Sequence, residues 1–137
     1  METGAWLSGH SAMHQFTTVG RYAFFEGATG ADRDVPPYSR ARGVHPVLCA
    51  GVNVVGLRRL GLGAEVVRQI REALGAIYPS GELAGVDREA LSAWAARGDL
   101  NEHARYLVDF VSRSAAHRFG RAREAGRYSA AAQAGHS

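Results

Sequence analysis

The sequence predicts two kinds of structure in one short chain: the end of a parallel β-helix, followed by a small helical domain. Six-residue units repeat from Leu7 onward, and each begins with an apolar residue. From residue 52 the apolar residues recur at steps of three and four, the spacing of an amphipathic helix. Strands therefore precede helices without alternation, which excludes a doubly wound α/β sheet.

The repeated units are LSGHSA, MHQFTT, VGRYAF, FEGATG and ADRDVP. A helix cannot use a period of six, because the marked positions would move around its surface. A hexapeptide-type β-helix can use it, since each unit forms one flat side of a triangular coil with its first residue pointing inward. The alternative is a pair of ordinary short strands joined by turns at Gly20 and Gly27. The apolar first positions are Leu7, Met13, Val19, Phe25 and Ala31, and the small or β-branched fifth positions are Ser11, Thr17, Ala23, Thr29 and Val35.

We expect strand pairing to stop at Pro36-Pro37, because proline has no backbone N–H to donate to a ladder. The predicted domains are residues 1–37, the terminal coils, and residues 38–119, a helical domain. Residues 120–137 are rich in Ala, Arg and Gly without an apolar period, and we expect them to be disordered. Because repeat proteins stack several coils, we also expect further coils to precede this chain.

Helices are predicted after an irregular, arginine-rich segment over residues 38–47. They cover residues 52–60, 64–78 and 87–97, with a further helix after the Asp99 and Glu102 pattern of a capping box. Asp87 is the expected N-cap of the third. The second carries an apolar stripe of Val66, Val67, Ile70, Leu74 and Ile77, and the fourth directs Leu100, Tyr106, Leu107, Phe110 and Val111 inward.

Composition narrows the classes of function. The net charge is +3, and all sixteen basic residues are arginine, interspersed with thirteen acidic ones. This mild balance argues against nucleic-acid binding. No apolar run could span a membrane and no secretory leader is visible, so we expect a cytoplasmic protein. Cys49, the only cysteine, is expected to be a buried small hydrophobe. No Cys or carboxylate completes a ligand shell around His10 and His14, so we expect neither a metal nor a cofactor.

Three segments resemble a known family in their order and spacing: HQF at 14–16, VGRYAFFEGATGADRDVPPYSRARG at 19–43 and GVNVVGLRRLG at 51–61. They resemble the carboxyl-terminal part of the acyl-[acyl-carrier-protein]–UDP-N-acetylglucosamine O-acyltransferases, which start lipid A biosynthesis. The resemblance runs from about Trp6 to Arg118. It implies left-handed parallel β-helices with a helical C-terminal domain, assembled as a homotrimer with active sites between subunits. It also implies transfer of a 3-hydroxyacyl group from acyl carrier protein to UDP-N-acetylglucosamine.

The resemblance assigns substrate-binding roles to His14, Gln15, Asn53 and Arg59. His14 and Gln15 match residues that line the family's cleft; without the resemblance, His14 would be interpreted as a turn residue. Asn53 and Arg59 match residues that reach the nucleotide sugar and its phosphates. Six residues are nearly two helical turns, so both side chains lie toward one side. The planar guanidinium of arginine suits phosphate because it donates two hydrogen bonds.

Gly27 matches the position that gauges acyl-chain length in the family. Glycine there would leave the acyl groove open to a long chain, although glycine at a β-helix corner also serves for its backbone freedom. Val55 stands where the family often has an acidic residue, and Leu60 where it has a third basic one. We therefore expect an altered nucleotide site. Arg58 is expected to be a solvated residue on the helix flank.

Tyr38, Arg40, Arg42 and His45 form a predicted basic loop. Such a surface would attract an acidic carrier protein, although a few exposed charges have a modest effect. A solvated connecting loop is therefore the default interpretation of this segment.

No catalytic residue is predicted in this chain. The family's general base is a histidine about two coils upstream of the HQF motif, so we expect no turnover by the chain alone. One interpretation is an acyltransferase whose base comes from an upstream stretch or a separately encoded partner. The alternative is a non-catalytic module, a truncated or degenerate paralogue that binds nucleotide sugar or trimerises. A third is a truncated product without a function of its own.

Overall fold

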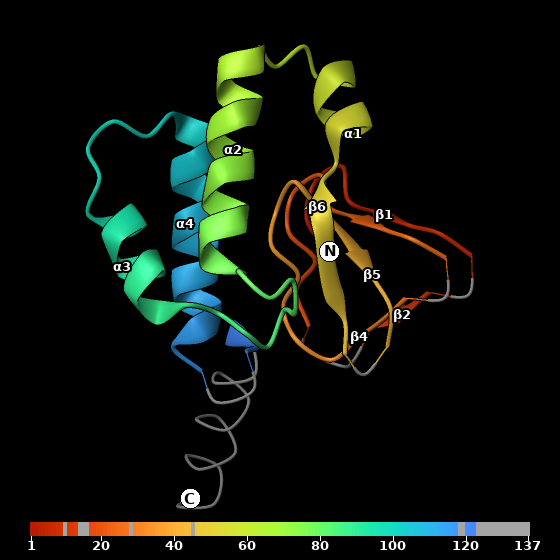
Figure 1. The fold of residues 1–137 in the computed structure, drawn as a ribbon. Helices are drawn as coiled ribbons and strands as arrows, with labels where there is room; N and C mark the ends of the chain where they lie inside the picture. Colours follow the sequence, from red (N-terminus) through yellow and green to blue (C-terminus); the bar gives the residue numbers. More distant parts are fainter. Residues whose placement is uncertain (10, 14–16, 28, 45, 118–119, 123–137) are drawn as a thin grey trace, which may run out of the picture.

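The computed structural model describes residues 1–9, 11–13, 17–27, 29–44, 46–117 and 120–122. Short strands form one side of the molecule and helices the other (Figure 1). Every element from the first strand to the last helix contributes to, or packs around, a single cluster of buried hydrophobic residues.

The first strands pair in parallel between successive passes of the chain. β1 (Trp6–Leu7), β3 (Phe24–Phe25) and β5 (Ser39–Arg42) lie side by side in one sheet. β2 (Ala12–Met13) pairs with β4 (Gly30–Ala31) in a second sheet. Trp6 pairs with Phe24 and Ala12 with Gly30, so each pair is separated by eighteen residues. An isolated parallel bridge joins Val19 to Val35.

A separation of eighteen residues equals three six-residue units, as the repeat predicts. The strands that flank Gly27, β3 and β4, belong to different sheets, so they do not form the alternative pair of neighbouring strands. The first positions of the later units, Val19, Phe25 and Ala31, are buried, whereas Leu7 and Met13 are partly buried and pack against the core.

Two residues of the repeated units, Thr29 and Gly20, make close contacts between successive passes of the chain. Thr29 is buried, and its hydroxyl donates to the backbone carbonyls of Glu26, at 2.6 Å, and Ala41, at 3.2 Å. Gly20 serves a close approach: a Cβ built there would lie 2.4 Å from the backbone nitrogen of Pro37. The hydroxyl of Thr29 thus joins one pass of the chain to the next, and the missing side chain of Gly20 lets two passes approach.

The expectation that strand pairing stops at Pro36-Pro37 is wrong. β5 begins at Ser39, separated from the prolines by Tyr38, and pairs in parallel with β3, with Phe24 opposite Arg40. β5 thus lies in the segment 38–47 that was predicted to be irregular, and β6 (Leu48–Val52) then pairs with it in the antiparallel direction. The prolines lie between the bridged Val35 and β5, where they interrupt no strand of the sheet.

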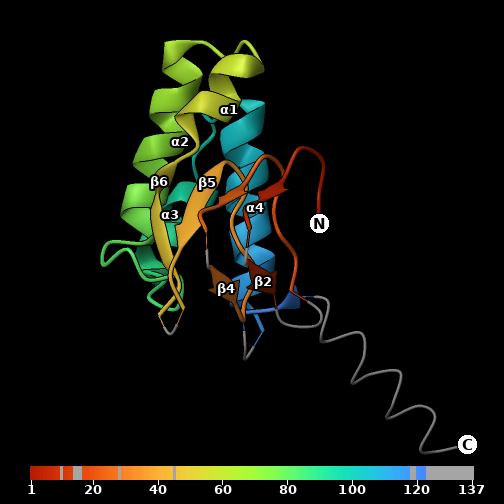
Figure 2. The same ribbon diagram turned by 90° about the vertical axis from the view of Figure 1, so that its right-hand side faces the viewer.

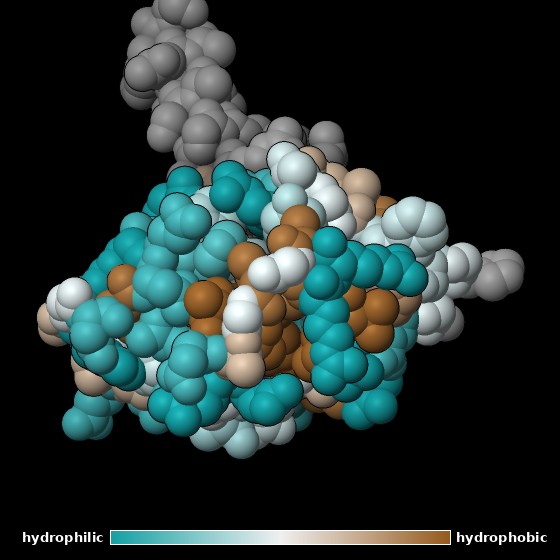
Figure 3. Space-filling view, turned by 90° about the horizontal axis from the view of Figure 1, so that it is seen from above, coloured by the Kyte–Doolittle hydropathy of each residue, from teal (hydrophilic) through white to brown (hydrophobic). Residues whose placement is uncertain are grey.

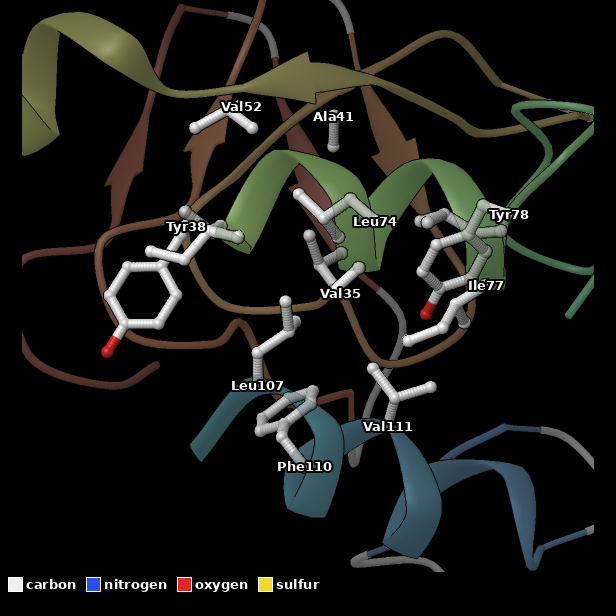
Figure 4. Packing of buried hydrophobic residues seen from close by; sticks show 14 of the residues in the cluster. Val35, Tyr38, Ala41, Val52, Leu74, Ile77, Tyr78, Leu107, Phe110 and Val111 are labelled. Carbon is white, nitrogen blue, oxygen red and sulfur yellow. The ribbon is translucent and has the colours of Figure 1, made fainter. Parts of the chain in front are cut away.

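The predicted helices are present with small differences in their ends. They are α1 (Val54–Arg59), α2 (Ala64–Ile77), α3 (Arg88–Ala95) and α4 (Glu102–Ala115). α2 packs against β6 on one side and against α3 and α4 on the other, and α1 lies at the end of the molecule opposite β2 and β4 (Figure 1, Figure 2). Figure 4 shows the side chains that meet between the strands, α2 and α4, among them Val35, Leu74, Ile77, Leu107 and Val111.

The start of α4 differs from the predicted capping box. Asn101 is the N-cap, and its side-chain oxygen accepts from the backbone N–H of Ala104 at 2.9 Å. Asp99 instead binds Arg97 through two hydrogen bonds of 2.9 and 2.7 Å. Asp99 lies two residues too early to cap, so Leu100 precedes the helix. By contrast, Asp87 caps α3 as predicted, with a 3.0 Å bond from the N–H of Ala90.

A buried carboxylate ties the helices to the coils. Asp34 accepts hydrogen bonds from the backbone N–H of Thr18 at 2.7 Å, from the hydroxyl of Ser114 on α4 at 2.7 Å, and from the N–H of Ala122 at 2.9 Å. Gly120 also accepts from the N–H of Asp34 at 2.7 Å. Residues 120–122, part of the predicted disordered tail, are thus bound to the coil. The division into residues 1–37, 38–119 and 120–137 stays a prediction.

Replacing Ser114 by alanine should lower the free energy of unfolding by about 1–2 kcal/mol, because the buried Asp34 carboxylate loses one donor. Ser112 provides the control, since it lies on the same helix without a side-chain hydrogen bond to the described residues. Urea denaturation of Ser114→Ala and Ser112→Ala measures both effects. Equal stabilities would show that the hydroxyl of Ser114 does not tie α4 to the coil.

Candidate functional site

A groove of about 570 Å³ separates α1 from the strands β1 and β3. Seen from the end that carries α1, hydrophobic residues gather near the centre of the surface, with hydrophilic residues on either side (Figure 3). The groove is lined by Gly4, Trp6, Tyr22, Phe24, Glu26, Arg40, Asn53, Val55, Gly56, Arg59 and Leu60. The structure therefore brings Asn53 and Arg59 to one site. Val55 and Leu60, the two residues that differ from those usual in the resembled family, line the same groove.

Asn53 holds α1 in place against the coil. Its side-chain oxygen accepts from the N–H of Gly56 at 3.2 Å, and its amide donates to the carbonyl of Tyr22 at 3.0 Å. Its backbone N–H donates to the carbonyl of Tyr38 at 2.8 Å. A Cβ at Gly56 would lie 2.4 Å from the Asn53 amide nitrogen, so glycine is needed for this cap. One amide N–H of Asn53 is left for a ligand.

Arg59 lies in the last turn of α1 and lines the groove, whereas Arg58 is exposed outside it. Arg59 makes no hydrogen bond or ion pair with any residue in the described part of the chain. Its guanidinium is therefore available to an anionic group in the groove.

The opposite wall carries ion pairs. Glu26 lies 3.6 Å from Arg40 and 3.9 Å from Arg42, and Arg40 also donates to the carbonyl of Ala50 at 3.2 Å. The predicted basic loop is thus a strand whose arginines are paired with a carboxylate. Tyr38, expected in the same loop, is fully buried with a φ of +65°. His45 lies outside the described residues.

A smaller cavity of about 310 Å³ adjoins the groove and shares Tyr22 and Leu60 with it. Its lining includes Arg21 and His103, and the Nδ1 atom of His103 lies 3.0 Å from the hydroxyl of Tyr38. Burial raises the pKa of Tyr38 to about 12, against the opposing effect of Arg21, so the phenol stays neutral at ordinary pH. The neutral phenol can donate to His103 when that ring carries its proton on Nε2, 3.5 Å from Glu102.

The remaining predicted residues lie elsewhere. His14, Gln15 and His10 lie outside the described residues. Gly27 occupies an exposed turn and does not line the groove; a Cβ there would meet only the carbonyl of Gly9, at 3.8 Å. Cys49 is half-buried, and burial raises the pKa of its thiol. No group of three or more potential metal ligands occurs in the described residues, and none of the helices described there is long and apolar enough to cross a membrane.

Sequence reasoning missed the strand wall of the groove. Trp6 and Phe24 each precede an inward-facing residue and pair with one another across β1 and β3. The repeat contains the signal that could have found them, because an aromatic residue before the inward position in two units eighteen residues apart predicts an aromatic outer face.

Comparisons with known proteins point to one family. The family model described as "Udp N-acetylglucosamine O-acyltransferase; Domain 2" matches residues 34–120. Two relatives named acyl-[acyl-carrier-protein]–UDP-N-acetylglucosamine O-acyltransferase come from Rhizobium johnstonii and Alkalilimnicola ehrlichii. The first is 39% identical over 106 residues, covering 77% of this chain and 38% of the relative. The second is 35% identical over 114 residues, covering 83% and 43%.

Solved structures agree with these relatives. A UDP-N-acetylglucosamine acyltransferase from Bacteroides fragilis superposes with a TM-score of 0.67 at 34% identity, covering 79% of this chain and 41% of that one. The enzyme from Arabidopsis gives a TM-score of 0.70 at 26% identity, covering 81% and 39%. The chain thus spans about two fifths of the length of the relatives it matches. By the matched domain and by these identities, this chain belongs to the UDP-N-acetylglucosamine O-acyltransferase family.

Proposed function

We propose that the chain forms the carboxyl-terminal part of a cytoplasmic acyltransferase of lipid A biosynthesis, which transfers a 3-hydroxyacyl group from acyl carrier protein to UDP-N-acetylglucosamine. The parallel strand pairs would be the last coils of a left-handed β-helix, and three chains would assemble as a homotrimer. Family membership supports the reaction class. The observation that carries the proposal is the groove in which α1 presents an unpaired Arg59 beside Asn53.

In this proposal the chain contributes binding groups. Arg59 holds a phosphate of the nucleotide sugar through its planar guanidinium. Asn53 offers its remaining amide N–H, and its side chain is already oriented by Gly56 and Tyr22. His14 and Gln15 would contact the sugar, and Gly27 would leave space for a long acyl chain. We assign the role of general base to no residue of this chain.

The second candidate function is a non-catalytic module that binds the nucleotide sugar or mediates trimerisation. It is favoured by the chemistry of the groove, whose lining in the described residues includes no histidine. The carboxylate that is present, Glu26, forms ion pairs with Arg40 and Arg42 and is not free to act on a ligand. Binding is common to both candidates, and turnover separates them.

Arg59→Ala should weaken binding of UDP-N-acetylglucosamine by about 1–3 kcal/mol, because a charge-assisted hydrogen bond to phosphate is lost. Arg58→Ala is the matched control and should have little effect, since Arg58 lies outside the groove. Isothermal titration calorimetry of the parent and both variants measures the difference. Equal losses in the two variants, or no binding to the parent, would refute the assignment of Arg59.

The 137-residue chain alone should not acylate UDP-N-acetylglucosamine. General-base catalysis contributes about 10²–10⁴-fold, and a chain without the base would also position the acceptor hydroxyl poorly. Product formation from (R)-3-hydroxyacyl carrier protein can be followed by mass spectrometry, with the Rhizobium johnstonii relative as the positive control. Turnover near that of the relative would show that a base is present in this chain and would exclude the non-catalytic module.

Assembly gives an independent prediction. The partly buried Leu7 and Met13 and the exposed Trp6 leave apolar surface on the coil, and unpaired strand edges associate with other strands. Light scattering coupled to size exclusion should therefore show a trimer, or a larger species, of the 14.7 kDa chain. A monodisperse monomer with a cooperative thermal transition would contradict the homotrimer.

A further inference from the structure

We propose that a separate cavity, at the end of the helices away from α1, binds a small monocarboxylate through the hydroxyl of Tyr78 and the guanidinium of Arg33. This Tyr78 cavity has a volume of about 250 Å³ and lies where α2 ends, α3 begins and α4 ends (Figure 1). It shares no lining residue with the groove beside α1. The inference therefore does not rest on the proposed function.

The hydroxyl of Tyr78 is the first sign of a ligand. Tyr78 is the C-cap of α2 and is 7% exposed, yet its hydroxyl makes no hydrogen bond with any described residue. Figure 4 shows its oxygen directed toward α4, where Val111 also lines the cavity. Buried tyrosine hydroxyls usually have a partner, because an unpartnered polar group costs free energy. A ligand in the cavity can supply that partner.

Two arginines supply positive charge to the same cavity. Arg33 is half-buried and makes no hydrogen bond or ion pair with a described residue. Its side chain packs on Gly120, where a Cβ would lie 3.0 Å from Nη1 of Arg33. Arg88, at the start of α3, donates one hydrogen bond to the carbonyl of Ala115 at 2.9 Å and keeps further N–H groups. The lining thus includes an unpaired guanidinium and a partly occupied one.

The charge of Arg33 reaches the phenol of Tyr78. Burial raises the pKa of Tyr78, and the guanidinium of Arg33 acts in the opposite direction. The phenol is therefore neutral at ordinary pH and can donate a hydrogen bond to an anion. A carboxylate placed between these two groups would accept from both.

Asp34 limits the charge that the cavity accepts. Its carboxylate also lines the cavity and accepts hydrogen bonds from Thr18, Ser114 and Ala122. With His117 neutral, two guanidinium groups and one carboxylate leave one net positive charge. A monoanion neutralises this charge, whereas a dianion exceeds it and is repelled by Asp34. The cavity therefore favours a carboxylate over a phosphate dianion.

Apolar side chains form the rest of the lining. Leu83 and Val111 belong to the buried cluster, and Val86 packs against it. A few converging polar groups on an apolar lining are typical of small-molecule sites, and this volume suits a small ligand. An inorganic ion would leave the apolar walls uncovered, whereas an apolar body on the carboxylate removes their surface from water. The ligand is therefore a carboxylate with an apolar body about the size of one ring.

The test uses benzoate and three partial probes. Benzamide has nearly the same shape without the charge, acetate lacks the ring, and phenyl phosphate is a dianion at about pH 8. NMR titration of the whole chain follows the amide signals of Val86, Ala115 and Gly120 at the cavity and of Gly56 at the groove. Benzoate should bind about tenfold or more tightly than each partial probe and should shift the cavity signals.

Tyr78→Phe separates a binding role from a structural one. An unpartnered hydroxyl does not stabilise the free protein, so the variant should unfold at a urea concentration equal to or above that of the parent. It should nevertheless weaken benzoate about fivefold or more, because a hydrogen bond to a charged group is lost. Tyr38→Phe is the matched control: its hydroxyl contacts His103, so it should lower the urea midpoint and leave benzoate binding unchanged.

Arg33→Gln should weaken benzoate about tenfold and leave benzamide unchanged, because it removes a charge. Arg71→Gln is the control, since Arg71 is exposed on α2 outside the cavity. Arg59→Ala should not change benzoate binding, and Tyr78→Phe should not change binding of UDP-N-acetylglucosamine. Failure of the nucleotide sugar to bind would count against the proposed function and leave benzoate binding in place.

Four results would overturn the proposal. Equal affinity for benzoate and benzamide would remove the role of the guanidinium groups. Phenyl phosphate binding as tightly as benzoate would remove the preference for a monoanion. A lower urea midpoint for Tyr78→Phe would show that its hydroxyl has a partner within the protein. No binding of benzoate would show that water alone fills the cavity.

Discussion

The parallel pairing of successive passes of the chain is the constraint on which the rest of the structure depends; the paired residues are separated by eighteen positions in β1–β3 and β2–β4 and by sixteen in β3–β5. It stacks the inward residues of one pass on those of the next, so that Val19, Phe25 and Val35 become part of the buried cluster. It also places residues far apart in the chain next to one another on the outside, as Trp6 and Phe24 show. The same strand pairing therefore builds the core with its inward residues and the wall of the groove with its outward residues.

α1 depends on this register because it is attached to the coil by residues at its first turn. The backbone N–H of Asn53 reaches the carbonyl of Tyr38, and its side chain reaches the carbonyl of Tyr22. Tyr22 and Tyr38 both have positive φ angles, and their rings stack with centroids 6.3 Å apart. Two strained turns of successive passes thus support the helix that presents Arg59. Asp34 attaches α4 to the strands in a similar way, because it accepts hydrogen bonds from Thr18 and from Ser114 near the end of that helix.

The site combines a rigid frame with one unsatisfied charge. Asn53 and Arg40 make hydrogen bonds to the chain itself, and Glu26 is held by two arginines. Arg59 stands out because the described residues give it no partner. The polar groups of the frame are held by the chain itself, whereas the guanidinium of Arg59 is left for the anionic group of the proposed ligand.

The sequence by itself determined the parts that depend on local pattern. The period of six predicted the separation within the first two strand pairs, although not the sixteen residues between β3 and β5. Steps of three and four predicted the helices, and Asp87 was identified as an N-cap from its position. These features follow from residues close together in the chain. Tertiary structure decided the rest: Tyr38 is buried although the segment that follows it is rich in arginine, Asn101 caps α4 in place of Asp99, and Arg40 and Arg42 are paired with Glu26. Their environment consists of residues brought together by the coil and by the packing of the helices, and a pattern confined to neighbouring residues does not contain that information.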